Sequence, residues 1–292
     1  MTAELILDAQ NGTGESPVWV PSEQALYWVD IPGKALHRWD TLNQQHSAWA
    51  TAQMPACIAR NPHGNWIAGM EDGVYQLVLN ADGSVTSTLL SRVEHALPGM
   101  RFNDGRCDRQ GRFWAGTMVM DMAQNRDAGV LYRYSGGHLS EQFAGFTTPN
   151  GLAFSPDGAT MYLSDSHPSV QRIWAFDYDT ASGTPHNRRL FVDMNAYPGR
   201  PDGAAMDSDG CYWICGNDAG LIHRFTPEGK LDRSVAVPVK KPAMCAFGGR
   251  ELDTLYVTSI RPGGDVSDQP LAGGVFAIDV GVRGVVESQW QG

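Results

Sequence analysis

Short runs in which apolar and polar residues alternate recur along the whole chain, and most are bounded by turns rich in Gly, Asp, Asn and Pro. Such alternation predicts β-strands with one buried face. The clearest run is Arg112–Met118, an aromatic strand entered through the turn Gln110–Gly111. No long window carries apolar residues at helical spacing, which argues against helical repeats. The pattern therefore predicts an all-β chain.

The predicted strands come in pairs, and the pair repeats six times. Each copy has a polar turn, a strand centred on an aromatic residue, a second turn and a second strand. A period of about 40–50 residues built of strands is typical of β-propeller blades. We therefore predict a single-domain, six-bladed β-propeller over residues 1–292, with four antiparallel strands per blade. Pairing of Leu5–Leu7 with the C-terminal repeat would close the ring and remove an open sheet edge. The central aromatic residues are Tyr27, Trp66, Trp114, Tyr162, Trp213 and Tyr256, at spacings of 39, 48, 48, 51 and 43 residues.

Composition narrows the class of protein and its partners. The net charge is 22 − 32 = −10, which argues against nucleic acid and anionic membranes as partners. The start, Met1–Glu4, lacks the basic and apolar runs of a secretory signal, and no apolar stretch is long enough to span a bilayer. We expect a cytoplasmic protein that is a monomer or a weak homo-oligomer. The cysteines are odd in number and form no C-x-x-C pair, so we expect free thiols: Cys57, Cys107, Cys211, Cys215 and Cys245.

Four of the six repeats carry a carboxylate or an amide at one equivalent position, 11 or 12 residues before the central aromatic. In a propeller this position falls on the innermost strand of the blade, so equivalent residues of different blades converge on the central channel. In the other two repeats the position is expected near Ala56–Cys57 and at Cys245. The four converging residues are Glu15, Asn103, Asn150 and Asp202.

Two carboxylates and two amides suit a hard divalent cation, which prefers oxygen ligands. No histidine lies near these positions, which disfavours a zinc site built from nitrogen and sulfur ligands. Taken singly, Pro149–Gly151 and Pro201–Gly203 could be ordinary turns. Because four such residues occur in register, we favour a metal site over four unrelated turns.

Four segments resemble motifs of the SMP-30/gluconolactonase family, whose regucalcin-like members are lactonases, and together they cover almost the whole chain. Ser16 in the first segment stands where the family has a glycine. The most specific match is Arg101–Gly105 followed by Ala115–Met118. The other segments are Thr13–Trp19, Thr148–Leu152 and Arg200–Gly203.

The resemblance implies which residues form the site. Glu15, Asn150 and Asp202 would bind one divalent metal, with Ca²⁺ as the first choice and Mg²⁺, Mn²⁺, Zn²⁺ or Fe²⁺ as alternatives. Asn103 would lie beside it and contact metal or substrate, and Arg101 would hold substrate oxygens. Asp121 stands where many members carry an acid that contacts substrate, often Glu.

The activity implied is the hydrolysis of a sugar lactone to its aldonic acid. The metal would act as a Lewis acid and lower the pKa of a bound water. Asp202 would serve both as ligand and as general base, while Arg101 and Asn103 would orient ring hydroxyls or steady the oxyanion. Polar residues expected at the rim, among them Asp121 and Arg261, favour a sugar acid.

Two other hypotheses about the function stay open. A related propeller could use the same metal centre as an esterase, a phosphoesterase or a lactonase for non-sugar lactones. Alternatively, the chain could be a non-catalytic calcium-binding propeller, although binding modules seldom place converging acids in the channel. No G-x-S-x-G elbow and no H-E-x-x-H motif is present, so serine hydrolase and zinc protease chemistry are disfavoured. The long segments 119–128 and 261–273 are candidate rim loops or lids.

Overall fold

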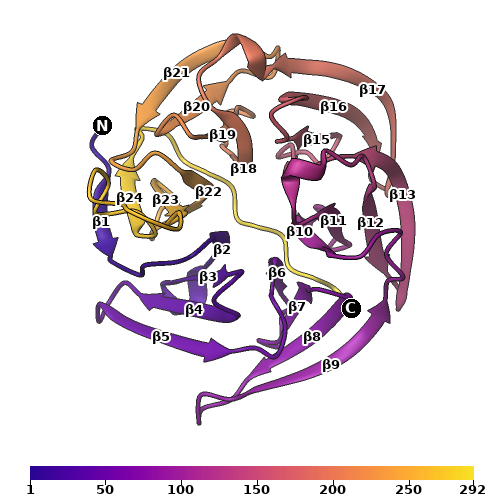
Figure 1. The fold of residues 1–292 in the computed structure, drawn as a ribbon, viewed down its shortest axis with the longest axis horizontal. Helices are drawn as coiled ribbons and strands as arrows, with labels where there is room; N and C mark the ends of the chain where they lie inside the picture. Colours follow the sequence, from indigo (N-terminus) through magenta and orange to yellow (C-terminus); the bar gives the residue numbers. More distant parts are fainter.

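The computed structural model describes residues 1–292 and contains six antiparallel sheets of four strands each, arranged in a ring (Figure 1). In five sheets each strand pairs with the next in chain order, from the centre of the ring to its outside, and the sixth takes its outermost strand from the N-terminus. The predicted six-bladed propeller is confirmed.

Every blade has four strands, named in order from the innermost to the outermost. Blade 1 holds β2 (Gly14–Val20), β3 (Ala25–Asp30), β4 (Ala35–Asp40) and β5 (Gln45–Ala50). Blade 2 holds β6 (Cys57–Arg60), β7 (Trp66–Gly69), β8 (Gly73–Leu79) and β9 (Val85–Arg92). Blade 3 holds β10 (Met100–Cys107), β11 (Phe113–Val119), β12 (Gly129–Ser135) and β13 (His138–Phe146). Blade 4 holds β14 (Pro149–Phe154), β15 (Thr160–Asp165), β16 (Arg172–Asp179) and β17 (Thr184–Asp193). Blade 5 holds β18 (Arg200–Met206), β19 (Tyr212–Asn217), β20 (Leu221–Phe225) and β21 (Leu231–Ala236). Blade 6 holds β22 (Pro242–Gly248), β23 (Thr254–Ser259), β24 (Val275–Asp279) and the N-terminal β1 (Glu4–Leu7).

Helical structure is confined to three short 3₁₀ turns, and none of them is long and apolar enough to cross a membrane. They are η1 (Pro21–Glu23), η2 (Met122–Gln124) and η3 (Met194–Ala196).

The ring is closed by the two ends of the chain, as predicted. Strand β1 pairs antiparallel with β24, with Glu4 opposite Ala277 and Leu5 opposite Phe276. The N-terminal segment thus becomes the outermost strand of the last blade, and both ends of the sequence hold one sheet together. Closure of this kind leaves no blade boundary without a neighbour.

The six central aromatics lie on the second strand of each blade and are all buried, so the repeat unit was correctly identified. They form the core between neighbouring blades. The rings of Tyr27 and Trp66, for example, have centroids 4.7 Å apart across the boundary between blades 1 and 2. All five cysteines are buried and free, as expected.

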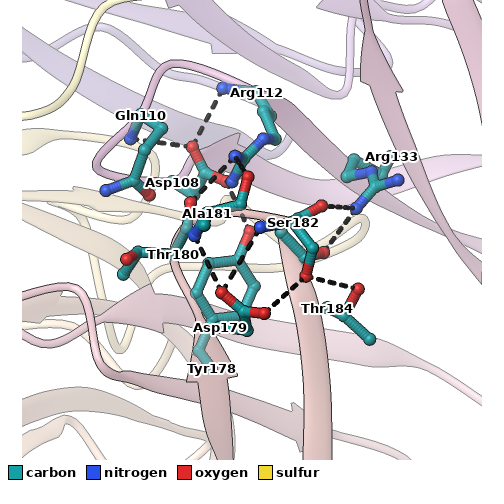
Figure 2. Close-up of polar contacts among 11 residues, drawn as sticks. Asp108, Gln110, Arg112, Arg133, Tyr178, Asp179, Thr180, Ala181, Ser182 and Thr184 are labelled. Carbon is teal, nitrogen blue, oxygen red and sulfur yellow. Dashed lines mark hydrogen bonds and ion pairs between the residues drawn. The ribbon is translucent and has the colours of Figure 1, made fainter.

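Polar turns fasten the blades to each other where the sequence carries Asp-x-x-Gly, and Figure 2 shows the contact between blades 3 and 4. Asp108 Oδ1 accepts the backbone N–H groups of Gln110 and Arg112, both at 2.9 Å. Its Oδ2 accepts from Arg112 Nη1 at 2.9 Å and from the hydroxyl of Tyr178 on β16. The guanidinium also donates to the carbonyls of Thr180 and Ala181, each at 2.8 Å. One buried carboxylate therefore shapes its own turn and holds the next blade.

Asp108→Ala should lower the free energy of unfolding by about 2–4 kcal/mol, because it leaves the buried Tyr178 hydroxyl, two N–H groups and the half-buried Arg112 guanidinium without their acceptor. Chemical denaturation measures the loss. The control is Asp179→Ala, which removes an exposed carboxylate from the same network, where it caps the turn at Ala181 N–H. The control should cost far less, and equal stability of the two variants would contradict this account of the blade contact.

Candidate metal centre

Five of the six predicted site residues line one cavity of ≈170 Å³, and the sixth, Asp121, does not. Glu15 on β2, Arg101 and Asn103 on β10, Asn150 on β14 and Asp202 on β18 all line it. Four blades therefore contribute their innermost strands to a single site. The other lining residues are Thr13, Met118, Met120, Met122, Thr148, Ser166, Arg200, Asn217 and Ile260.

The four converging residues share one backbone feature, a break in the pairing between the first and second strands. A bulge leaves residues out of the ladder and redirects their side chains. Because the break occurs at the equivalent position in these four blades, the four side chains can point toward the same cavity. The breaks lie between Glu15 and Val18, Phe102 and Gly105, Asn150 and Ala153, and Pro201 and Ala204.

The residue after the site position adopts a left-handed backbone in two blades, with φ of 51° at Ser16 and 57° at Gly151. Glycine takes this conformation at no steric cost, whereas serine is strained in it. The Ser16 hydroxyl accepts the N–H of Ile58 on β6 at 2.9 Å. This hydrogen bond to blade 2 explains how a serine is held where the family pattern has glycine.

Counting back a fixed number of residues from each central aromatic gave the wrong residue for the site position in blade 6. In each blade, the site position lies three residues before the first-strand residue that pairs with the central aromatic. Ala246 is the partner of Tyr256, so the equivalent residue is Ala243, not Cys245. In blade 2 the same rule gives Cys57, in the expected pair. The turns between first and second strands differ in length, which a fixed count cannot register. Neither residue offers an oxygen ligand, so the site is built by four blades.

Two carboxylates fix the backbone that leads into the site. Asp30 at the end of β3 accepts the N–H groups of residues 12–13 at 3.0 and 2.9 Å, just before Glu15. Asp165 at the end of β15 accepts those of residues 147–148 at 2.7 and 3.0 Å, just before Asn150. The sequence pattern alone did not single out these two acids. Their position in the repeat could have identified them, because each is the last residue of the second strand of its blade.

In blade 5 the residue at the end of the second strand is Asn217, and its side chain hydrogen-bonds directly to a site residue. Its Nδ2 donates to Asp202 Oδ2 at 2.5 Å, and its Oδ1 accepts from Arg200 Nη2 at 3.4 Å. Arg200 Nε pairs with Asp218 at 2.6 Å, and Lys241 pairs with the same carboxylate. A hydrogen-bonded amide, backed by two ion pairs, thus fixes the orientation of Asp202, as outer residues do at metal sites.

Burial and mutual repulsion disfavour negative charge at this site. Burial, followed by the carboxylates of Asp202 and Asp104, raises the pKa of Glu15 well above its usual range. Burial raises the pKa of Asp202 to about 7, against the opposing effects of Arg200 and Asn217. Two buried carboxyls with raised pKa values need a nearby cation to ionise together.

The donor set fits a divalent metal in one further respect. Asn150 is buried, and its Oδ1 has no hydrogen-bond partner in the protein. Buried amide oxygens are almost always paired, so an orphan acceptor beside two carboxylates is the feature a hard cation would satisfy. No three side chains from His, Cys, Asp and Glu gather anywhere in the molecule as a metal cluster. A centre here would therefore depend on two carboxylates supplemented by amide oxygen.

Arg101 and Asn103 form the next layer of the cavity. Arg101 Nη1 donates to Asn103 Oδ1 at 3.0 Å and to the carbonyl of Phe102 at 2.6 Å. Asn103 Nδ2 donates to the carbonyl of Pro149 at 3.0 Å, which ties blade 3 to blade 4. Arg101 forms no ion pair, and burial lowers the pKa of its guanidinium to about 10. A partly buried cation with uncommitted N–H groups is suited to bind substrate oxygens.

Asp121 does not line the cavity. Its carboxylate is exposed and caps η2, accepting from Ala123 N–H and Gln124 Nε2, both at 3.2 Å. The rest of the 119–128 segment does approach the site, because Met122 lines the cavity and its carbonyl lies 3.0 Å from His167 Nε2. The substrate contact predicted for Asp121 has no support in this arrangement, and apolar Met122 occupies the place on the cavity wall.

The rim differs from the polar one expected. Arg101 lines the cavity, but Asp121 and Arg261 do not. The lining also includes four apolar residues, Met118, Met120 and Met122 from blade 3 and Ile260 from blade 6. The cavity thus offers polar groups for hydroxyl and carbonyl oxygens and apolar side chains for C–H groups.

Comparison with known proteins shows which family the chain belongs to. Residues 13–261 match the SMP-30/Gluconolactonase/LRE-like region, which is most of the chain. The chain therefore belongs to the SMP-30/gluconolactonase family.

Relatives match over their full length. The chain is 38% identical to 6-deoxy-6-sulfogluconolactonase of Pseudomonas putida, covering 100% of this chain and 99% of that protein. It is 34% identical to regucalcin of Bos taurus, covering 97% and 96%. Among solved structures, the calcium-binding protein regucalcin from Agrobacterium tumefaciens superimposes with a TM-score of 0.92 at 27% identity, covering 100% of this chain and 97% of that one.

The raised pKa values predict how pH acts on the metal-free protein. A raised carboxyl pKa means that the folded state holds a proton that the unfolded state, with a pKa near 4, has released. The contribution of Glu15 and Asp202 to the free energy of unfolding should therefore fall as pH rises from about 4 to about 7, the pKa of Asp202. Thermal unfolding from pH 4 to 8 measures this slope, and the Glu15→Gln/Asp202→Asn double variant should flatten it. An equal slope in the double variant would contradict the account.

Proposed function

We propose that this protein hydrolyses a sugar lactone to the aldonic acid with one divalent cation, held by Glu15, Asn150 and Asp202. The observation that carries the proposal is that two buried carboxyl residues, Glu15 and Asp202, line the same cavity as Asn150, whose Oδ1 has no hydrogen-bond partner. Membership of the family and the names of the full-length relatives support lactone hydrolysis. We propose Ca²⁺ first, because all donors are oxygens and a structural relative is described as calcium-binding.

When bound, the cation supplies Lewis acidity for the lactone carbonyl and acidity for the attacking water. The chain's own residues do the rest. The Asp202 carboxylate, oriented by Asn217, takes the proton from the water. Arg101, oriented through Asn103, directs its remaining N–H groups at the substrate oxygens. The side chains of Met118 and Met122, which line the cavity, pack against C–H groups of the substrate ring.

The proposal predicts a strict dependence on metal. Protein stripped by a chelator should not accelerate hydrolysis of any aldonolactone beyond the spontaneous rate, and activity should return with Ca²⁺, Mg²⁺, Mn²⁺ or Zn²⁺. A pH-indicator assay over a panel of sugar lactones measures both the metal and the sugar preference. Metal binding without lactonase activity would transfer support to an ester or phosphoester substrate, or to a calcium-binding propeller without catalysis. Full activity after stripping would contradict the role of metal.

Asp202→Asn should lower kcat by a factor of about 10² to 10⁴, because asparagine keeps an oxygen ligand but cannot accept the proton. Steady-state kinetics at saturating metal separate this effect from weaker metal binding. The matched control is Asp121→Asn, which changes an exposed acid outside the cavity and should leave kcat near the wild-type value. Full turnover by Asp202→Asn with bound metal would overturn its assignment as base.

A further inference from the structure

The segment after the last strand, residues 280–292, crosses the centre of the ring and forms a strap (Figure 1). It lies beyond the region that matches the family, which ends at residue 261. Backbone hydrogen bonds fasten it to four blades. They join Ser208 N–H to Arg283 O and Gly284 N–H to Leu252 O, both at 2.8 Å, then Trp290 N–H to Arg60 O at 2.9 Å and Gln291 N–H to Gly111 O at 3.1 Å.

The strap covers the mouth of the channel opposite the candidate metal centre. Its partners lie at the C-terminal ends of the innermost strands or in the turns that follow them. Glu15, Asn150 and Asp202 lie near the N-terminal ends of theirs. The tip of the strap is anchored, because Trp290 is only 4% exposed and its ring centroid lies 6.4 Å from that of Tyr134.

One side chain of the strap enters the channel and makes a buried ion pair. Glu287 Oε1 lies 2.8 Å from Arg106 Nη1, and the arginine side chain is 9% exposed. The other terminal nitrogen of Arg106, Nη2, donates to the carbonyl of Ala204 at 2.5 Å. Ala204 ends the bulge that presents Asp202, two residues earlier. The strap is thus connected to the backbone of a site residue through one guanidinium.

A neighbour of Arg106 makes the equivalent contact to the next site strand. Asp104 Oδ2 accepts the N–H of Leu152 at 2.8 Å, two residues after Asn150. Asp104 and Arg106 of β10 therefore hold the backbones of β14 and β18, in each case two residues after the site residue. Of these two side chains, only Arg106 is also held by the strap. A plug that only filled the channel would need no such carboxylate.

We propose that the strap is a positioning element of the metal centre, in which Glu287 holds Arg106 and Arg106 holds the β18 bulge that presents Asp202. This inference rests on the metal centre proposed above. Glu287 and Arg106 are positioning residues and touch neither metal nor substrate. Since outer contacts at metal sites change affinity by about 10–100-fold, loss of Glu287 should weaken the metal site without unfolding the propeller.

Calorimetric titration of the chelator-stripped full-length protein with Ca²⁺ and Mn²⁺ tests the inference, with thermal unfolding measured in parallel. Glu287→Ala should raise the Kd for metal by about tenfold or more. Glu287→Gln keeps an oxygen for Arg106 and should restore most of the affinity. The control is Arg283→Ala, which removes an exposed ion pair between the strap and Glu251 and should leave Kd unchanged. Lactone turnover at saturating metal should then recover in Glu287→Ala.

Each outcome separates the strap from the proposed function. If Glu287→Ala lowers the melting temperature but binds metal as the wild type does, the strap is only a stabilising plug and the inference is overturned. If the wild type binds neither ion, the metal centre itself fails, and the inference with it. Should Glu287→Ala not fold, Arg106→Lys tests the same contact, since a single ammonium cannot reproduce both arms of the guanidinium, and unchanged metal affinity there would also overturn the inference.

Discussion

The cost of burying Glu15 and Asp202 side by side is the physical constraint on which the site depends. Each carboxyl has a raised pKa, and the adjacent Asp104 adds to the repulsion. An uncompensated buried charge costs several kcal/mol, so a fold keeps such a pair only where a cation balances it or where the groups stay protonated. Of the positive charges nearby, Arg200 is committed to Asp218 and Arg106 to Glu287, and Arg101 alone is free to offset part of the charge on Glu15. One guanidinium cannot balance two carboxylates, so the remaining negative charge is left for a ligand.

The propeller solves a second problem, which is how to hold groups that are far apart in sequence at one point. Side chains on a regular strand alternate across the blade and do not face the channel. The repeated break in first-strand pairing redirects one side chain per blade, and Asp30, Asp165 and Asn217 then fix the approach or the side chain itself. Rigid positioning of this kind is what distinguishes a preorganised centre from a loop that happens to be acidic.

Much of this could be predicted from the sequence because the repeat unit is visible in it. The aromatic spacing gave the number of blades, and the shared offset before Tyr27, Trp114, Tyr162 and Trp213 identified the residues that meet in the cavity. The misplaced Cys245 had a local cause, since turn length varies between blades and a count assumes that it does not. Asp121 failed to reach the cavity because its loop folds into a capped 3₁₀ turn. The strap could not be predicted, because residues 280–292 have no counterpart in the other repeats.

The most direct test of the central claim is anomalous diffraction from crystals of the protein soaked in Mn²⁺. The account predicts one strong peak in the cavity, about 2.0–2.6 Å from side-chain oxygens of Glu15, Asn150 and Asp202. Binding there would give the orphan Oδ1 of Asn150 its partner and balance the two carboxylates. An empty cavity at saturating Mn²⁺, or a bound ion that leaves Asn150 without a contact, would contradict the claim that Glu15, Asn150 and Asp202 converge from three blades to hold a metal.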